Sequence, residues 1–363
     1  MNTFTIDELS TPATLDDEGA GDFIEMTDVR NEIEADIVGN YDLAYSPAEL
    51  LPNWQDPYQH QRAIVARVGG RIVARALYRA PIEDDSNEAW FVVEVLSDLR
   101  RRGIGAALYD RLAGFAAEQG RTVLQSYVLH KGAAGERIAA PTGYGSVPRD
   151  SPEIRFALAH GFALEQVGRM SRLELPADAL DQRLAAATTA AGPDYRVVLW
   201  TGRTPQPWLA DSAMMHARMS TDAPSAGLDV AEEVWDEARV IETEDRDESS
   251  PRTVLLAAAQ HVPTGRLVAF SELSVPPLVE RPVSQQDTLV IAEHRGHRLG
   301  LLVKLANLQR LADTHPGHPA VTTFNAEENR RMLDVNEAIG FRAVGYEGGW
   351  KKTVQPPRLR RRR

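Results

Sequence analysis

One stretch of the 363-residue chain, Val93–Leu112, constrains the fold more than any other. Phe91–Val95, which overlaps its start, is mostly apolar and rich in β-branched residues, as expected of a buried strand. Three arginines then lead into Gly103-Ile104-Gly105-Ala106, and apolar residues at helical spacing follow from Leu108 to Phe115. The sequence therefore predicts a strand, a basic glycine turn and an amphipathic helix in direct succession.

The chemistry of such a turn favours a ligand that carries phosphate. Glycines let the backbone turn sharply and approach a ligand closely. The first N–H groups of the following helix are unpaired and carry the positive end of its dipole, so an anion is the expected occupant. Two other glycine-loop sites fit less well: a dinucleotide fingerprint needs a small residue where Leu108 stands, and a P-loop needs Gly-Lys-Ser/Thr. An ordinary helix start that happens to be basic is the remaining alternative.

The second half of the chain repeats the landmarks of the first. Gly70-Arg71-Ile72-Val73-Ala74 matches Gly265-Arg266-Leu267-Val268-Ala269, an offset of 195 residues. Gly161-Phe162 recurs as Gly340-Phe341, an offset of 179. The long insertion Lys131–Pro152, rich in glycine and proline, accounts for the difference of 16. Because the landmarks keep their order, the sequence indicates a duplicated domain.

Each copy predicts the same order of elements. Hairpins are expected over Arg62–Tyr78 and Thr253–Leu273. The glycine loop of copy one recurs 195 residues later, as Arg295–Leu301 of copy two, and a helix is expected after it over Leu301–Ala312. We expect an α+β (mixed α/β) chain with two domains, each a twisted, mostly antiparallel sheet flanked by helices. The expected divisions are a disordered N-terminus (1–21), a first domain (22–175), an alanine-rich helical linker (176–193), a second domain (194–352) and a basic tail (353–363).

The spacing Arg100-x-x-Gly103-x-Gly105-Ala106 after a strand resembles the acyl-CoA pyrophosphate loop of the GNAT superfamily of N-acetyltransferases. Asn325–Phe341 resembles the end of the GNAT core, where an asparagine after the fifth strand precedes a helix that ends in Gly-Phe. The resemblance covers 22–175 and 194–352, so the chain is similar to tandem-GNAT proteins of the actinobacterial type. It implies transfer of an acetyl group from acetyl-CoA to an amine, by direct attack in a ternary complex.

The resemblance places acetyl-CoA at both glycine loops and implies no metal. The copies differ at the loop, because Arg298 stands where copy two should have its first glycine, and its side chain either hinders the pyrophosphate or binds it. His294 and His297 flank this loop, but their spacing without further clustered ligands disfavours a metal site. The candidate cofactor-binding residues are Val95, Arg100, Arg101, Arg102, Gly103, Ile104, Gly105 and Ala106 in copy one, and Val290, Arg295, Gly296, His297, Arg298, Leu299, Gly300, Leu301 and Asn329 in copy two.

Carboxylates are the candidates for the base that removes a proton from the acceptor ammonium. Copy two offers Glu272 on its hairpin and Asp287 at the expected start of the strand that leads to its loop. Copy one has Leu77 and Val92 at those offsets, and offers Glu94 instead. A carboxylate within an apolar strand has a raised pKa unless it is paired, which suits a base. An outward-facing surface carboxylate is the alternative at each position.

The departing thiolate has no obvious proton donor. Where the family often has a tyrosine, five residues before the phenylalanine of Gly-Phe, the copies have Ala157 and Asn336. Asparagine can donate a hydrogen bond but is not a useful proton source, and a thiol is acidic enough to leave without a general acid. Other tyrosines stay open as donors: Tyr109, Tyr127, Tyr144 and Tyr346.

Composition limits the partners. The chain has a net charge of −12 and no cysteine, which excludes a disulfide framework and a cysteine nucleophile and disfavours nucleic acid. An acidic field favours a small cationic amine as acceptor. With no apolar run of about 18 residues and no leader-like N-terminus, we expect a cytoplasmic enzyme that does not bind membranes. The alternatives are a tandem-GNAT acyltransferase with another donor, and a CoA-binding or scaffolding module in which one or both copies have decayed.

Overall fold

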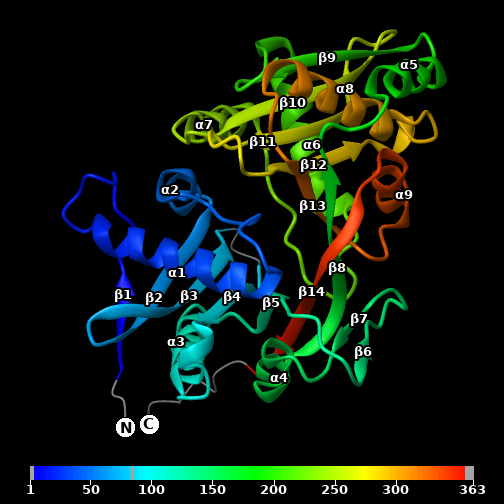
Figure 1. Cartoon of the computed structure of the whole chain (residues 1–363). Helices are drawn as coiled ribbons and strands as arrows, with labels where there is room; N and C mark the ends of the chain where they lie inside the picture. Colours follow the sequence, from blue (N-terminus) through cyan, green and yellow to red (C-terminus); the bar gives the residue numbers. More distant parts are fainter. Residues whose placement is uncertain (1–3, 83–85, 356–363) are drawn as a thin grey trace, which may run out of the picture. The chain divides into compact units, whose positions relative to one another are not determined.

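Figure 1 shows the computed structural model, which describes residues 4–82 and 86–355. The chain forms two compact units. Unit 1 holds the chain up to Gly168, the short segment Ser225–Ala231 and the chain from Tyr346, whereas unit 2 holds Arg169–Pro224 and Glu232–Gly345. The expected basic tail lies outside the described residues from position 356 onward.

Unit 1 is built on a sheet whose strands lie in the order β1-β2-β3-β4-β5-β14-β8. The pairs β1–β2, β2–β3, β3–β4 and β5–β14 are antiparallel, and β4–β5 is parallel. The mostly antiparallel sheet that the sequence predicts is therefore confirmed. The strands are β1 (Thr5–Leu9), β2 (Gln59–Val68), β3 (Arg71–Pro81), β4 (Glu88–Val95), β5 (Val123–Leu129), β8 (Ala163–Glu174) and β14 (Arg342–Thr353).

Helices cover both faces of this sheet, because alternate strand residues point to opposite sides. Leu77 of β3 belongs to the buried cluster of Phe23 and Trp54, whereas its neighbour Tyr78 belongs to the cluster of Leu112. The first cluster lies under α1 (Ala20–Val38) and α2 (Pro47–Trp54), and the second under α3 (Ile104–Glu118) and α4 (Pro152–Ala159). The insertion before α4 adds a small pair of strands, β6 (Arg137–Ala139) and β7 (Ser146–Pro148).

Unit 2 repeats the plan with the strand order β8-β13-β12-β11-β10-β9. Here α6 and α7 lie on one face of the sheet. The helices α5, α8 and α9 lie on the opposite face, where they contribute to a second buried cluster. The strands are β9 (Tyr195–Thr201), β10 (Thr253–His261), β11 (Leu267–Val275), β12 (Val283–Val290) and β13 (Ala320–Ala326). The helices are α5 (Leu180–Ala191), α6 (Leu209–Asp222), α7 (Glu237–Glu248), α8 (Leu299–Thr314) and α9 (Arg330–Ile339).

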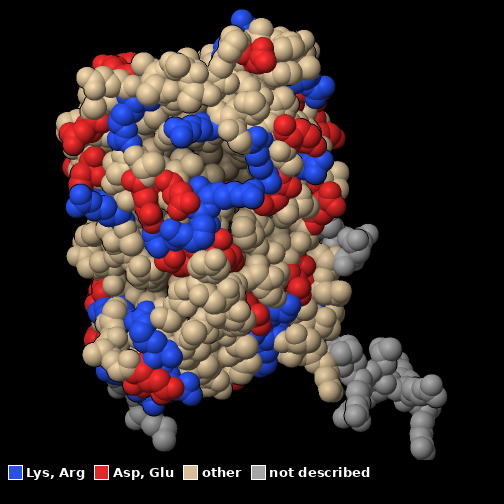
Figure 2. Space-filling model, turned by 90° about the vertical axis from the view of Figure 1, so that its right-hand side faces the viewer, with Lys and Arg blue, Asp and Glu red and all other residues tan. Residues whose placement is uncertain are grey.

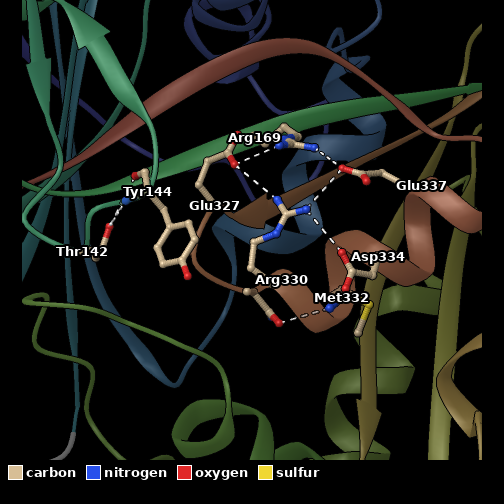
Figure 3. Close-up of polar contacts among 9 residues, drawn as sticks. Thr142, Tyr144, Arg169, Glu327, Arg330, Met332, Asp334 and Glu337 are labelled. Carbon is tan, nitrogen blue, oxygen red and sulfur yellow. Dashed lines mark hydrogen bonds and ion pairs between the residues drawn. The ribbon is translucent and has the colours of Figure 1, made fainter.

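The two copies exchange their last strands. From Tyr346, β14 of copy two lies in unit 1 beside β5, and from Arg169, β8 of copy one lies in unit 2 beside β13. Figure 3 shows how Arg169 fastens the exchanged segment: its guanidinium donates to both oxygens of Glu327 at 2.8 and 2.9 Å and to Glu337 at 2.7 Å. The sequence copies 22–175 and 194–352 therefore do not coincide with the compact units at their ends.

Two segments are more ordered than the sequence suggests. Within the N-terminus expected to be disordered, β1 pairs with β2 in the register Thr5↔Arg67, and Leu9 is buried. Within the expected linker, α5 is helical, and its Ala187 and Ala191 are buried in the same cluster as α8. This helix is thus part of the core of unit 2 and does more than connect the two copies.

Candidate functional site

Each unit opens its sheet beside its glycine loop. In unit 1, β4 pairs with β5 only over Glu88–Trp90 and Val123–Gln125. In unit 2, β12 pairs with β13 only at Val283 and Ser284. Beyond these pairs the parallel strands diverge, so the facing N–H and C=O groups have no strand partner across the gap among the described residues. An extended ligand arm that carries amide groups can pair with such a free strand edge.

The two glycine loops have the same backbone conformation although their residues differ. Left-handed φ angles occur at Arg101 (64°) and Gly103 (85°) in copy one, and at Gly296 (93°) and Arg298 (55°) in copy two. Glycine and arginine have thus exchanged places between the two left-handed positions. Since a non-glycine residue tolerates this region at a cost of about 1 kcal/mol, the turn of copy two keeps its shape despite Arg298.

The first arginine of each loop has a structural role. The Nε of Arg100 donates to the Val95 carbonyl at 3.0 Å, and Arg295 does the same to Val290 at 3.1 Å. Arg100 also pairs with Glu153 of α4 at 2.7 Å. These guanidinium groups hold the loops, and Arg102 also donates to the Asp98 carbonyl, at 3.2 Å. Arg101 in copy one and Arg298 in copy two are exposed cations that can meet a phosphate.

The first turns of α3 and α8 differ in how much space surrounds their glycines. A β-carbon on Gly105 would lie 3.1 Å from the Phe156 ring, whereas one on Gly300 would lie 3.6 Å from Val290, an ordinary contact. Ile104 and Leu299 are buried, so they anchor the loops in the two cores. Of the other predicted residues, Gly103 and His297 are exposed beside the turns, and Ala106 and Leu301 lie in the first turns of the helices.

A cavity of about 300 Å³ lies in unit 2 between α6, α7 and the sheet. Glu272 of β11 lines it, and this half-buried position raises the pKa of Glu272 to about 8, with the negative charge of Asp287 adding to the shift. His216 of α6 stacks on Trp235, with ring centres 4.6 Å apart. Burial lowers the pKa of His216 to about 4, so this imidazole is neutral at pH 7.

Asp287 lies in the middle of a strand, which corrects the expectation that it begins one. Ser271 pairs with Thr288 while Leu273 pairs with Gln285, so two residues of β12 lie opposite Glu272 in a bulge. Asp287 is one of these two residues, and its side chain is exposed. The surrounding protein raises the pKa of Asp287, and the charge of Glu233 adds to the shift. The two candidate carboxylates of copy two are therefore close enough for the charge of Asp287 to raise the pKa of Glu272, although Asp287 does not line the cavity.

The corresponding face of copy one is filled. Leu77, at the offset of Glu272, is buried beneath α1. Glu94 is paired with Arg75 at 2.5 Å, and Arg30 pairs with Glu34 at 2.8 Å on α1. Glu94 is therefore not the free carboxylate that a general base requires. We expect the charges here to stabilise the packing of α1 on the sheet.

Two asparagines shape the end of copy two. Asn329 caps α9, because its side chain accepts from the Met332 N–H. Asn325 lies in β13, where its side chain accepts a 2.7 Å hydrogen bond from Asn336. Asn336 is 1% exposed, so this candidate catalytic residue holds Asn325 in place and does not face an open space.

The tyrosine candidates have varied surroundings. Tyr109 is buried and its hydroxyl accepts from Lys352 at 2.9 Å, and Tyr127 donates to Gln166 at 3.2 Å. Tyr144 is exposed in the insertion, where its backbone binds Thr142 (Figure 3). The structure therefore favours none of them as the proton donor.

Some residues near these sites carry no sequence signal that we recognised. His261 and Tyr195 join the two loop histidines, with the Tyr195 hydroxyl 2.8 Å from Nδ1 of His294. Among the described residues, however, no group of three or more His, Asp or Glu is arranged to hold a metal ion. His216, Trp235 and the α7 carboxylates come together only in the fold.

Across the described chain, no helix has the length and apolar character needed to cross a membrane.

Comparisons with known proteins agree with this geometry. The sequence profile of the Acetyltransferase (GNAT) family matches residues 27–134. A tandem GNAT protein from the clavulanic acid biosynthesis pathway, solved without AcCoA, is 23% identical with a TM-score of 0.74, covering 98% of this chain and 99% of that one. A GCN5-related N-acetyltransferase from Sphaerobacter thermophilus is 13% identical with a TM-score of 0.59, covering 97% and 96%. No curated protein sequence matches. The fold is thus two GNAT domains in tandem.

Proposed function

Because the GNAT family model matches residues 27–134 and the chain has the fold of a tandem GNAT protein, we propose that its second copy transfers the acetyl group of acetyl-CoA to a small cationic amine. The observation that carries the proposal is Glu272, a carboxylate with a pKa near 8 at the wall of a cavity in the unit that also bears the second glycine loop. A group with this pKa can accept a proton near neutral pH.

Acetyl-CoA fits the donor side by its chemistry. Its pyrophosphate is an anion suited to the start of α8, where the helix dipole and free N–H groups face the loop. Its pantetheine arm carries two amides, which suit the unpaired edge of β12 beyond Ser284. The exposed guanidinium of Arg298 adds a positive charge beside the turn.

The carboxylates that line the cavity favour a cationic acceptor. They are a stronger argument for a cation than the net charge of the whole chain. Figure 2 shows acidic and basic side chains interspersed over one face of the molecule, so the charge of −12 is not spread there as a uniform acidic field. Glu272, Glu244 and Asp247, in contrast, all line one small space. A protonated amine is attracted there before it reacts.

The chemical step is a direct substitution. Glu272 takes a proton from the ammonium, and the amine nitrogen attacks the thioester carbonyl carbon. A C–N bond forms, the C–S bond breaks, and CoA leaves as a thiolate, which takes up the second proton that the nitrogen loses as it becomes an amide. The enzyme mainly holds the two reactants in attack geometry. Copy one, with its filled face and intact loop, binds acetyl-CoA without catalysing transfer.

The test replaces the proposed base and a matched carboxylate in the other copy. We expect Glu272→Gln to lower kcat by a factor of about 10² or more with little change in the Kd for acetyl-CoA, because general-base catalysis typically contributes this much. Glu94→Gln changes the same group in copy one and should leave the Kd of copy two unchanged. Thiol release and calorimetric titration give the two readouts. Full turnover in Glu272→Gln would refute the role of Glu272.

A CoA-binding or scaffolding module is the second candidate, favoured by the lack of a proton donor at Ala157 and Asn336. Stoichiometric binding of acetyl-CoA without thiol release against a panel of amines would support this candidate over catalysis. Two binding sites per chain would mean that both loops accept the cofactor, and one site would mean that one copy has become structural.

A further inference from the structure

We propose that the acceptor of copy two carries two cationic groups, one that reacts beside Glu272 and a second that α7 holds, so that the substrate class is a short diamine or a comparable dication. This inference rests on the proposed function and extends it, because it names a second binding subsite. Four features of the cavity support it: the face that α7 presents, the charges of the lining, an unsatisfied hydroxyl and an aromatic wall.

The cavity wall formed by α7 is one continuous helix face. The lining residues on this helix are spaced by three, one, three and one positions, which is the repeat of a single face. The face begins with the buried Val240 and continues with carboxylates toward the end of the helix. The α7 residues that line the cavity are Val240, Thr243, Glu244, Asp247 and Glu248.

The charges on the lining are unbalanced. Glu244, Asp247, Glu248 and Glu272 line the cavity, whereas Arg252 is the one arginine among the lining residues and His216 is neutral. Glu248 is paired with Arg203 at 3.0 Å, so Glu244 and Asp247 are the α7 carboxylates that we expect to hold the second cation. The guanidinium of Arg252 donates to Ser274 at 2.7 Å, which directs it along the sheet. The negative charges of Asp247 and Glu244 both raise the pKa of Glu272, so the α7 carboxylates share an electrostatic space with the proposed base.

The unsatisfied group is the hydroxyl of Thr204. Thr204 is 6% exposed and lines the cavity, and its backbone N–H donates to Glu244 at 3.0 Å. Its Oγ1 lies beside the same carboxylate but makes no hydrogen bond of acceptable geometry with any described group. An ammonium group has three N–H donors and no acceptor. It can therefore donate to Thr204 and Glu244 together while its positive charge offsets that of the carboxylate, which a neutral donor cannot do.

The remaining wall suits the carbon chain between the two charges. His216 and Trp235 are stacked with an interplanar angle of 23°, and both line the same cavity as Glu272 and the α7 carboxylates. A volume of about 300 Å³ holds roughly ten non-hydrogen atoms at about 30 Å³ for each water-sized group. A linear diamine such as 1,5-diaminopentane is within this limit.

The experiment compares acceptors that differ only in the second group. The intact chain is assayed for thiol release with acetyl-CoA and 1,5-diaminopentane, 1-aminopentane or 5-amino-1-pentanol. We expect kcat/KM for the diamine to exceed both other values by at least tenfold. The double variant Glu244→Gln/Asp247→Asn should reduce the ratio of kcat/KM for the diamine to kcat/KM for the monoamine to within about twofold of one. Glu237→Gln removes a charge from the same helix outside the cavity and should keep the ratio.

A second variant guards against misfolding of the double one. Thr204→Val keeps the shape of the side chain and removes the hydroxyl, and we expect it to lower the diamine preference severalfold. Equal kcat/KM values for diamine and monoamine, or an unchanged preference in both variants, would overturn the inference.

Calorimetry separates this inference from the proposed function. If no amine is acetylated but the diamine still binds at least tenfold more tightly than the monoamine, and Glu244→Gln/Asp247→Asn abolishes the difference, the dication subsite stands and the proposed transfer fails. If neither amine is acetylated and neither shows preferential binding, the inference itself is refuted.

Discussion

Lys304→Met is expected to stabilise unit 2 by several kcal/mol at neutral pH. Lys304 lies in the second turn of α8 and is 2% exposed, and it makes no hydrogen bond or ion pair with any described residue. Burial alone lowers the pKa of its ammonium from 10.5 to about 7. Methionine has a side chain of similar length without the charge, so the substitution removes the cost of burying this amine.

The magnitude follows from linkage. A difference of about 3.5 pKa units between the unfolded and folded states is worth about 5 kcal/mol at 1.36 kcal/mol per unit. The folded pKa lies below the unfolded value, so the folded state binds fewer protons between pH 7 and pH 10.5. The penalty is therefore complete below pH 7, about 4 kcal/mol at pH 7 itself, and lost as the pH approaches 10.5.

The assay is urea unfolding of the wild type and the variant at pH 7, 8, 9 and 10. The difference in unfolding free energy should shrink by somewhat more than 1 kcal/mol per pH unit above pH 8, because other titrating groups cancel in the difference. Lys131→Met, at a half-exposed surface lysine, should show less than about 1 kcal/mol and no such trend. A difference at Lys304 that is near zero, or independent of pH, would refute the reasoning.

Two further predictions concern the copy-two site. Log kcat/KM should rise with pH to a plateau with a midpoint near 8, because the raised pKa of Glu272 keeps most of the base protonated at pH 7. A pH–rate profile from pH 6 to 9.5 measures this rise, which should disappear in Glu272→Gln. Arg298→Gly should raise the unfolding free energy by about 1 kcal/mol at most, since it removes a left-handed non-glycine residue, and should weaken acetyl-CoA binding severalfold in a calorimetric titration; tighter binding would instead show that the guanidinium hinders the pyrophosphate.

Local sequence patterns were sufficient to predict most elements of the fold. Both hairpins, both loop helices and the two glycine loops lie where periodicity and turn chemistry place them, because each is decided by neighbouring residues. The exchange of β8 and β14 could not be predicted in this way. A buried strand has the same alternation whichever sheet it joins, and the contacts that fix the exchange, such as Arg169 with Glu327, join residues 158 positions apart.

The candidate site was predictable only in part, and for a similar reason. Glu272 could be selected because a carboxylate in an apolar hairpin strand is unusual in any fold. Glu94 has the same sequence signature, yet its partner Arg75 is on the adjacent strand, and only the register reveals the ion pair. His216 and Glu244 belong to stretches without a motif, and only the packing of α6 and α7 brings them to one cavity.

The helices that follow the two loops indicate how the copies have diverged. Tyr109 and Leu112 of α3 are buried in an apolar core, whereas the residues 195 positions later on α8 are Lys304 and Asn307, which are equally buried. Asn307 donates to the Leu255 and Ser271 carbonyls, at 2.9 and 3.0 Å. Buried polar groups of this kind are costly unless function retains them. Copy two therefore keeps buried polar groups beneath the loop and sheet that we propose bind the reactants, at positions where copy one has an apolar core.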